Sequence, residues 1–187
     1  MTRQEAWELV CRYVPSEALR RHMLAVEAAM RHYAGVLGGD VQQWGLVGLL
    51  HDFDYERWPQ PPEHTRQGAK ILREQGVDEE IIAAILSHAE WNHEDFPLDR
   101  PLRKALYAVD ELCGFIHAVA LVRPTRLEGM TPKSVKKKMK APSFAAAVKR
   151  EDIAKGADLL GLSLDEHIAH CIKAMQGISA ELGLHPT

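Results

Sequence analysis

The stretch that decides the fold is residues 41–56, VQQWGLVGLLHDFDYE. Residues 41–50 are apolar on almost every side of a helix, which is typical of a helix buried in a protein core. Asp40 stands where it can cap the beginning of that helix. His51 and Asp52 follow at its end, so the sequence predicts two polar side chains in apolar surroundings.

The segment before this stretch predicts a long amphipathic helix that begins after Ser16 and ends at Gly38 and Gly39. Its apolar residues recur at steps of three and four, and His22 falls at the edge of the stripe that they form. That stripe consists of Leu19, Met23, Val26, Met30, Tyr33 and Leu37.

Two more histidines follow the decisive stretch. The segment WPQPPEH, residues 58–64, contains three prolines and predicts a loop that leads to His64. A helix is expected from about His64 to Gly76, and another begins after Asp78. The isoleucines of this second helix form a core face that His88 continues, seven residues after Ile81. His88 is therefore expected to point inward.

The second half of the chain also reads as helical. Residues 102–123 predict a helix with an apolar stripe, and Asp99 stands before it as a capping residue. Asp110 lies among the apolar residues of that helix. Three shorter helices are expected to open at Thr131, Ser143 and Ser163. No segment alternates as a strand does, so the sequence predicts an all-α fold. We expect a single domain over residues 1–187, with a helical bundle core at about 16–120 and a C-terminal helical extension at about 130–187.

Composition narrows the classes of function. Of 187 residues, 46% are hydrophobic and 26% are charged, which is ordinary for a globular protein. The formal net charge of −3 argues against a nucleic-acid-binding protein. No segment has the length or hydrophobicity of a membrane span or a secretory leader. The three cysteines lie far apart, which favours a reducing cytoplasm over a disulfide framework.

Several polar residues are predicted on the buried faces of different helices, where they are costly unless something pairs with them. Imidazoles and carboxylates are the usual ligands of zinc, iron, manganese and magnesium. The sequence therefore predicts a site for one or two divalent metal ions of that group. The candidate ligands on these buried faces are His22, His51, Asp52, His88 and Asp110.

The adjacent pair His51-Asp52 suits such a site because neighbours on a helix point about 100° apart. They can approach one ion from two sides, or the carboxylate can bridge two ions. Bound metal lowers the pKa of water towards neutrality, and a second ion holds the leaving oxygen of a phosphoryl group. This pattern predicts hydrolysis of a phosphate ester.

The ordered set of residues resembles the HD superfamily, which has a helix histidine, a His-Asp doublet, further histidines and a late aspartate. The resemblance covers about residues 16–120 and includes LLHDFDYE, EHTRQGAKIL, IIAAILSHAEW and ALYAVDEL. It implies an all-helical fold and metal-dependent phosphomonoester or phosphodiester hydrolysis. It also implies that His22, His51, Asp52 and Asp110 hold a first ion. His64 and His88 then hold a second ion, with Asp52 as the bridge.

One part of the sequence departs from the pattern of many dinuclear members, which continue the doublet as His-Asp-Ile-Gly-Lys. Here it continues as Phe53-Asp54-Tyr55-Glu56, so the lysine that faces substrate in those members is missing. The motif HDFDYE resembles that of a small bacterial subgroup of predicted HD hydrolases.

Other residues carry weaker predictions. Asp52 and Glu56 are the candidate catalytic residues, with Glu56 transferring a proton, and Asp54 is an alternative that would orient His64. A basic segment after the Asp110 helix is suited to contact a substrate phosphate. Its candidate substrate-binding residues are Arg123, Lys133, Lys136 and Lys137.

The expected function is therefore a metal-dependent phosphohydrolase that acts on a small phosphorylated molecule such as a nucleotide. Two alternatives remain open. Some HD relatives resemble this chain in ligand order and use two irons to activate oxygen, which makes a diiron oxygenase the second hypothesis. The third is a non-catalytic sensor or binding module that keeps metal for structure alone.

Overall fold

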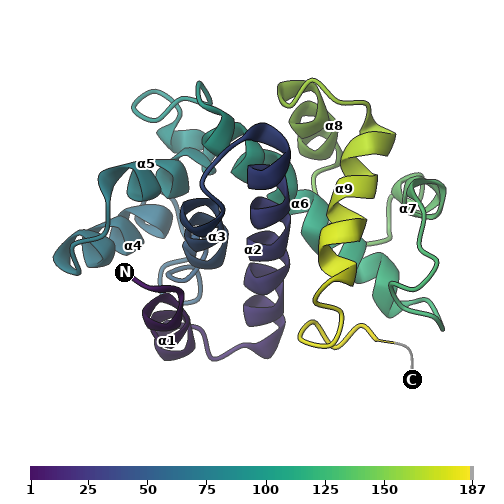
Figure 1. Cartoon of the computed structure of the whole chain (residues 1–187), viewed down its shortest axis with the longest axis horizontal. Helices are drawn as coiled ribbons and strands as arrows, with labels where there is room; N and C mark the ends of the chain where they lie inside the picture. The colour runs from purple at the N-terminus through teal and green to yellow at the C-terminus, as the bar shows by residue number, and fades with distance from the viewer. Residues whose placement is uncertain (186–187) are drawn as a thin grey trace.

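The computed structural model of the protein describes residues 1–185. Over that range its regular secondary structure consists entirely of helices, which loops and turns connect (Figure 1). This confirms the predicted all-α class. The helices are α1 (Arg3–Tyr13), α2 (Glu17–Leu37), α3 (Val41–Leu50), α4 (Glu63–Glu74), α5 (Glu79–Ser87), the 3-10 helix η1 (Glu90–Asn92), α6 (Pro101–Leu121), α7 (Pro132–Met139), α8 (Arg150–Leu159) and α9 (Leu164–Gln176).

The long helices α2 and α6 run through the middle of the molecule, and α3 packs along α2 (Figure 1). The boundaries of α2 and α3 follow from local chemistry. The hydroxyl of Ser16 accepts from the backbone of Leu19, and Gly38 ends α2 with φ of 74°. Asp40 then accepts from two backbone amides of α3. The short connection makes α2 and α3 antiparallel neighbours.

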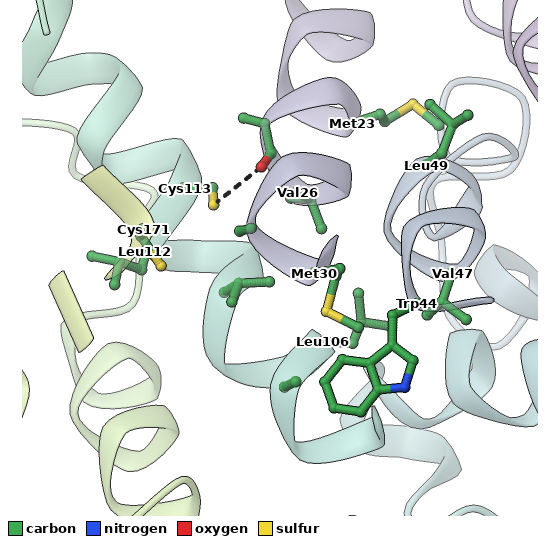
Figure 2. Close-up of a cluster of buried hydrophobic side chains, with 14 of the residues drawn as sticks. Met23, Val26, Met30, Trp44, Val47, Leu49, Leu106, Leu112, Cys113 and Cys171 are labelled. Carbon is green, nitrogen blue, oxygen red and sulfur yellow. Dashed lines mark hydrogen bonds between the residues drawn. The ribbon is translucent and has the colours of Figure 1, made fainter. Parts of the chain in front are cut away.

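Apolar side chains from these three helices fill the core. Figure 2 shows Met23, Val26 and Met30 of α2 facing α3, with Leu106 and Leu112 of α6 in the same cluster. All of these residues are almost fully buried. Burial of one such side chain contributes about 1.5–3 kcal/mol. The same packing fixes the polar residues carried by α2, α3 and α6.

The C-terminal helices pack on the same central helices. α8 contacts α6, and α9 contacts both α2 and α6. His167 of α9 is fully buried, with one ring nitrogen 2.6 Å from the Tyr33 hydroxyl and the other 2.9 Å from the Ala108 carbonyl oxygen. Apolar residues of α8 and α9 join the core cluster of the first helices.

Three details differ from the sequence predictions. The helix α1 was not predicted, although Thr2 and Glu5 form a capping box at its start. Asp99 does not cap α6, because the cap is Arg100 and Pro101 occupies the first turn. The helix predicted from Ser143 is also wrong. The chain turns there, and α8 begins only at Arg150.

Within residues 1–185, no helix combines the length and the apolar character that crossing a membrane requires.

Candidate metal centre

The structure brings the six predicted ligands together from five helices. His22 lies on α2, His51 at the end of α3, His64 near the start of α4, His88 at the end of α5 and Asp110 in the middle of α6. Asp52 follows His51 directly. Nitrogen and oxygen atoms of these side chains approach one another within 3.0–3.5 Å.

Asp52 is the centre of this cluster. Its Oδ2 lies 3.5 Å from Nε2 of His51, and its Oδ1 lies 3.3 Å from Nε2 of His64 and 3.4 Å from Nε2 of His88. Two groups of metal-ligating atoms therefore share it, His22–His51–Asp52 and Asp52–His64–His88. One carboxylate with two oxygens facing two imidazole groups is the arrangement that a bridging ligand requires.

Backbone carbonyls orient two of the imidazoles. Nδ1 of His51 donates to the carbonyl of Gly48 at 2.8 Å, and Nδ1 of His88 donates to the carbonyl of Ile85 at 2.6 Å. Because Nδ1 is engaged by a backbone carbonyl, Nε2 is the ring atom that faces Asp52, and it can offer its lone pair to a metal ion once it has lost its proton. Both rings are thus held in the orientation that a metal ion bound at Nε2 requires.

His64 is oriented by a carboxylate instead. Its Nδ1 donates to Asp54 at 2.9 Å, and the other oxygen of Asp54 accepts from the backbone of Gly68 at 2.7 Å. Asp54 is 1% exposed, so this bond is shielded from water. Asp54 thus occupies the orienting position next to His64 that the sequence offered as its alternative role.

The backbone at the start of α4 is bent to place His64. His64 has φ −53° and ψ 137°, and Thr65 has a φ of 70°. A β-branched residue in the left-handed region is strained, which costs on the order of 1–3 kcal/mol. The hydroxyl of Thr65 accepts from the side-chain amide of Asn92 at 2.9 Å, which helps to hold this conformation.

The charges in the cluster stabilise one another. Burial alone would raise the pKa of Asp52, but the charge of His51 and hydrogen bonds from His64 and His88 hold this pKa well below its ordinary value. Burial alone would lower the pKa of His64, but hydrogen bonds with Asp52 and Asp54 raise it to about 9. The metal-free site therefore binds protons in place of a cation.

The arrangement of donors fits a metal ion. Nε2 of His22 lies 3.2 Å from Nε2 of His51, and both face Asp110. Two ring nitrogens with lone pairs repel at that distance unless a cation or a proton stands between them. Together with the two carboxylates, they form a nitrogen and oxygen ligand set for a divalent ion.

An open pocket of about 400 Å³ gives access to this cluster. His22, Asp52, His64, His88 and Asp110 all line it, whereas His51 lies buried beneath them. The exposed rings of Tyr55 and Trp91 also line the pocket, and each packs edge-on against His64. A small molecule can therefore reach the candidate ligands directly.

The family model of the HD domain matches residues 19–113, just over half of the chain. The chain belongs to the HD domain family. No curated protein and no solved structure matches it. HD domains generally bind divalent metals and hydrolyse their substrates, and the matched residues include all six predicted ligands. The HDFDYE subgroup and the ligand role of each residue remain predictions.

Other predicted site residues of this HD domain protein lie outside the pocket. Glu56 is exposed and accepts from the backbone of Ser16 at 3.4 Å. Arg123 donates to carbonyls of its own loop, and Lys136 pairs with Asp165 of α9. Lys133 and Lys137 lie with Lys136 on α7, which is at the opposite end of the molecule from α4 and α5 (Figure 1). Their roles in catalysis and phosphate binding remain predictions.

Sequence reasoning missed several residues that line the pocket, among them four with polar side chains on α6 and at the start of α8. Tyr107 and Glu111 flank Asp110 on α6, and Lys149 and Asp152 lie at the start of α8. Burial, and next the charge of Asp110, raises the pKa of Glu111 to about 7. Only Tyr107 and Glu111 could have been found from the sequence, because they lie within one helical turn of Asp110.

The raised pKa of His64 predicts how the metal-free protein responds to pH. Its contribution to stability is fully present below the ordinary pKa of 6.5 and is lost as the pH rises through about 9. The full shift corresponds to a free energy of unfolding on the order of 3 kcal/mol. Urea unfolding in the presence of a chelator should therefore show falling stability from pH 6.5 to 9.

A His64→Gln variant is the control for this prediction, because it lacks the titrating ring. Its metal-free stability should change less over the same pH range. Equal pH profiles for the variant and the parent would show that His64 does not carry the effect.

Proposed function

We propose that the protein is a metal-dependent phosphohydrolase that uses metal-activated water on a small phosphorylated substrate. The observation that carries the proposal is the position of Asp52, which belongs to both ligand groups and also lines the open pocket. A substrate in the pocket then lies against both groups at once.

Divalent ions bound at these ligands supply a Lewis acid for a phosphoryl oxygen and lower the pKa of a water molecule. The residues of the chain do the rest. Asp52 orients both halves of the site, while Gly48, Ile85 and Asp54 fix the rings of His51, His88 and His64. A ligand set that is held before substrate arrives pays no reorganisation cost during the reaction.

The size of the pocket supports a small substrate. A volume of about 400 Å³ falls at the lower end of pockets that hold small molecules and cofactors. A pocket of this size has room for a phosphoryl group with a leaving group of modest size.

The test of this proposal combines metal content with activity. Protein purified without chelators should contain one or two zinc, manganese, magnesium or iron ions per chain, measured by elemental analysis. When it is saturated with that metal, it should release phosphate from at least one member of a broad panel of phosphate esters.

Other outcomes identify the alternatives. Two irons with consumption of oxygen, and no released phosphate, would indicate an oxygenase. Bound metal with neither activity in folded protein would indicate a structural metal in a binding module. Protein that binds no metal would refute the proposal itself.

A further inference from the structure

The pocket extends beyond the ligands onto a second wall that the HD domain match does not fully cover. This wall includes Glu90 of η1 and Tyr107 and Glu111 of α6. The start of α8 contributes Lys149 and Asp152, which lie after the matched residues 19–113. We call these five residues the acidic wall. A substrate whose phosphoryl group faces Asp52 and whose remaining part extends towards α8 lies next to this wall.

The acidic wall carries more negative than positive charge. Glu90, Glu111 and Asp152 contribute carboxylates, and Lys149 is the one lysine or arginine that lines the pocket among residues 1–185. Even with Glu111 uncharged, the carboxylates of Glu90 and Asp152 outnumber the single ammonium. The wall is therefore acidic even when the candidate metal ligands are not counted.

The ammonium of Lys149 is already shared. Its Nζ lies 3.8 Å from Glu90 and 4.0 Å from Asp152. Asp152 is held in place by the hydroxyl of Tyr107, which donates to it at 2.7 Å. An anionic group that approaches Lys149 therefore also comes close to the carboxylates of Glu90 and Asp152.

We infer that the acidic wall selects phosphomonoesters whose remaining part is uncharged or cationic, and that it disfavours a second anionic group. This inference rests on the proposed function. One phosphoryl group is attracted to a site that holds divalent cations, but a carboxylate or second phosphate beyond it meets Glu90 and Asp152. Like charges a few ångströms apart repel appreciably at a partly exposed site. Glu90 and Asp152 are thus specificity-determining residues, and hydroxyl or amino groups are their natural partners.

The test uses three phosphomonoesters of similar size with different charges on the other end: ethanolamine phosphate, glycerol phosphate and phosphoglycolate. Activity assays give kcat/KM for the metal-loaded protein, and calorimetry gives the affinity. We expect both to be at least about tenfold lower for phosphoglycolate than for ethanolamine phosphate, a difference of roughly 1.4 kcal/mol. Glycerol phosphate should fall between them.

A double variant, Glu90→Gln with Asp152→Asn, should reduce that ratio towards one. Both replacements keep the size of the side chain, and the amide oxygen that replaces the carboxylate of Asp152 can still accept from Tyr107. Glu151→Gln is the matched control, because Glu151 is exposed on the same helix and does not line the pocket. It should keep the parent ratio.

The possible results separate the two proposals. Equal affinity for all three compounds, or a ratio that the double variant leaves unchanged, overturns the inference while phosphate release still supports the proposed function. Ordered binding without phosphate release supports the acidic wall and contradicts hydrolysis. Folded, metal-loaded protein that binds none of the three contradicts both.

Discussion

Replacement of Asp52 by asparagine is expected to abolish hydrolysis and to remove metal from both ligand groups. Asp52 is the one residue that the two groups share, and each of its oxygens faces an imidazole at 3.3–3.5 Å. An amide offers one weak acceptor and no charge in its place. The loss of activity should exceed the roughly 10–100-fold that removal of an outer partner of a metal ligand costs.

Elemental analysis and phosphate release measure this prediction on the same sample. Thermal unfolding with and without added metal gives an independent readout, because an ion that binds only the folded protein raises its stability. That increase should be absent in Asp52→Asn. The control is Asp158→Asn, an exposed aspartate that does not line the pocket and should behave like the parent. Full metal content and activity in Asp52→Asn would refute the bridging role.

The sequence predicted most of this cluster because most of the candidate ligands stand on, or directly after, helices whose apolar pattern is clear. His22 is at the edge of the stripe of α2, and Asp110 is within the stripe of α6. Buried faces meet at a core, so polar residues on several of them meet one another. The order of these residues added the family resemblance, which the HD domain match confirms.

The other side of the pocket was not predictable in the same way. Lys149 and Asp152 reach the site because α8 packs across α6, and no local pattern fixes that crossing. The prediction of a helix from Ser143 was also wrong, so the turn that precedes Lys149 was not expected. For α7, the lysines were evident in the sequence, but the direction in which that helix points depends on its contacts with α9.

Gly48 is a further residue whose role appears only in the fold. A Cβ atom at this position would lie 2.8 Å from the carbonyl oxygen of Val26 and 2.9 Å from the backbone of Glu27. These are main-chain atoms of α2, which cannot rotate away as a side chain does. The carbonyl of Gly48 also accepts from Nδ1 of His51. This close approach of α2 and α3 thus contributes to the distance between His22 and His51.

We therefore expect Gly48→Ala to destabilise the protein by about 1–3 kcal/mol or more, as overpacking of a core does. Because α3 must move away from α2, the metal affinity should fall together with the stability. Urea unfolding and metal titration measure the two effects. The matched control is Gly35→Ala on α2, where a Cβ atom meets nothing within 4 Å. There the helix should gain about 0.5–1 kcal/mol, because alanine is the better helix former.

The comparison of the two glycine variants separates backbone propensity from helix contact. Both replace glycine by alanine within a helix, so a gain from propensity is common to them. Only Gly48→Ala forces two backbones apart, and only that variant should weaken metal binding. If Gly48→Ala binds metal as the parent does while its stability falls, the approach of α2 and α3 serves the core alone. In that case, the position of His51 depends on the rest of α3 and not on this contact.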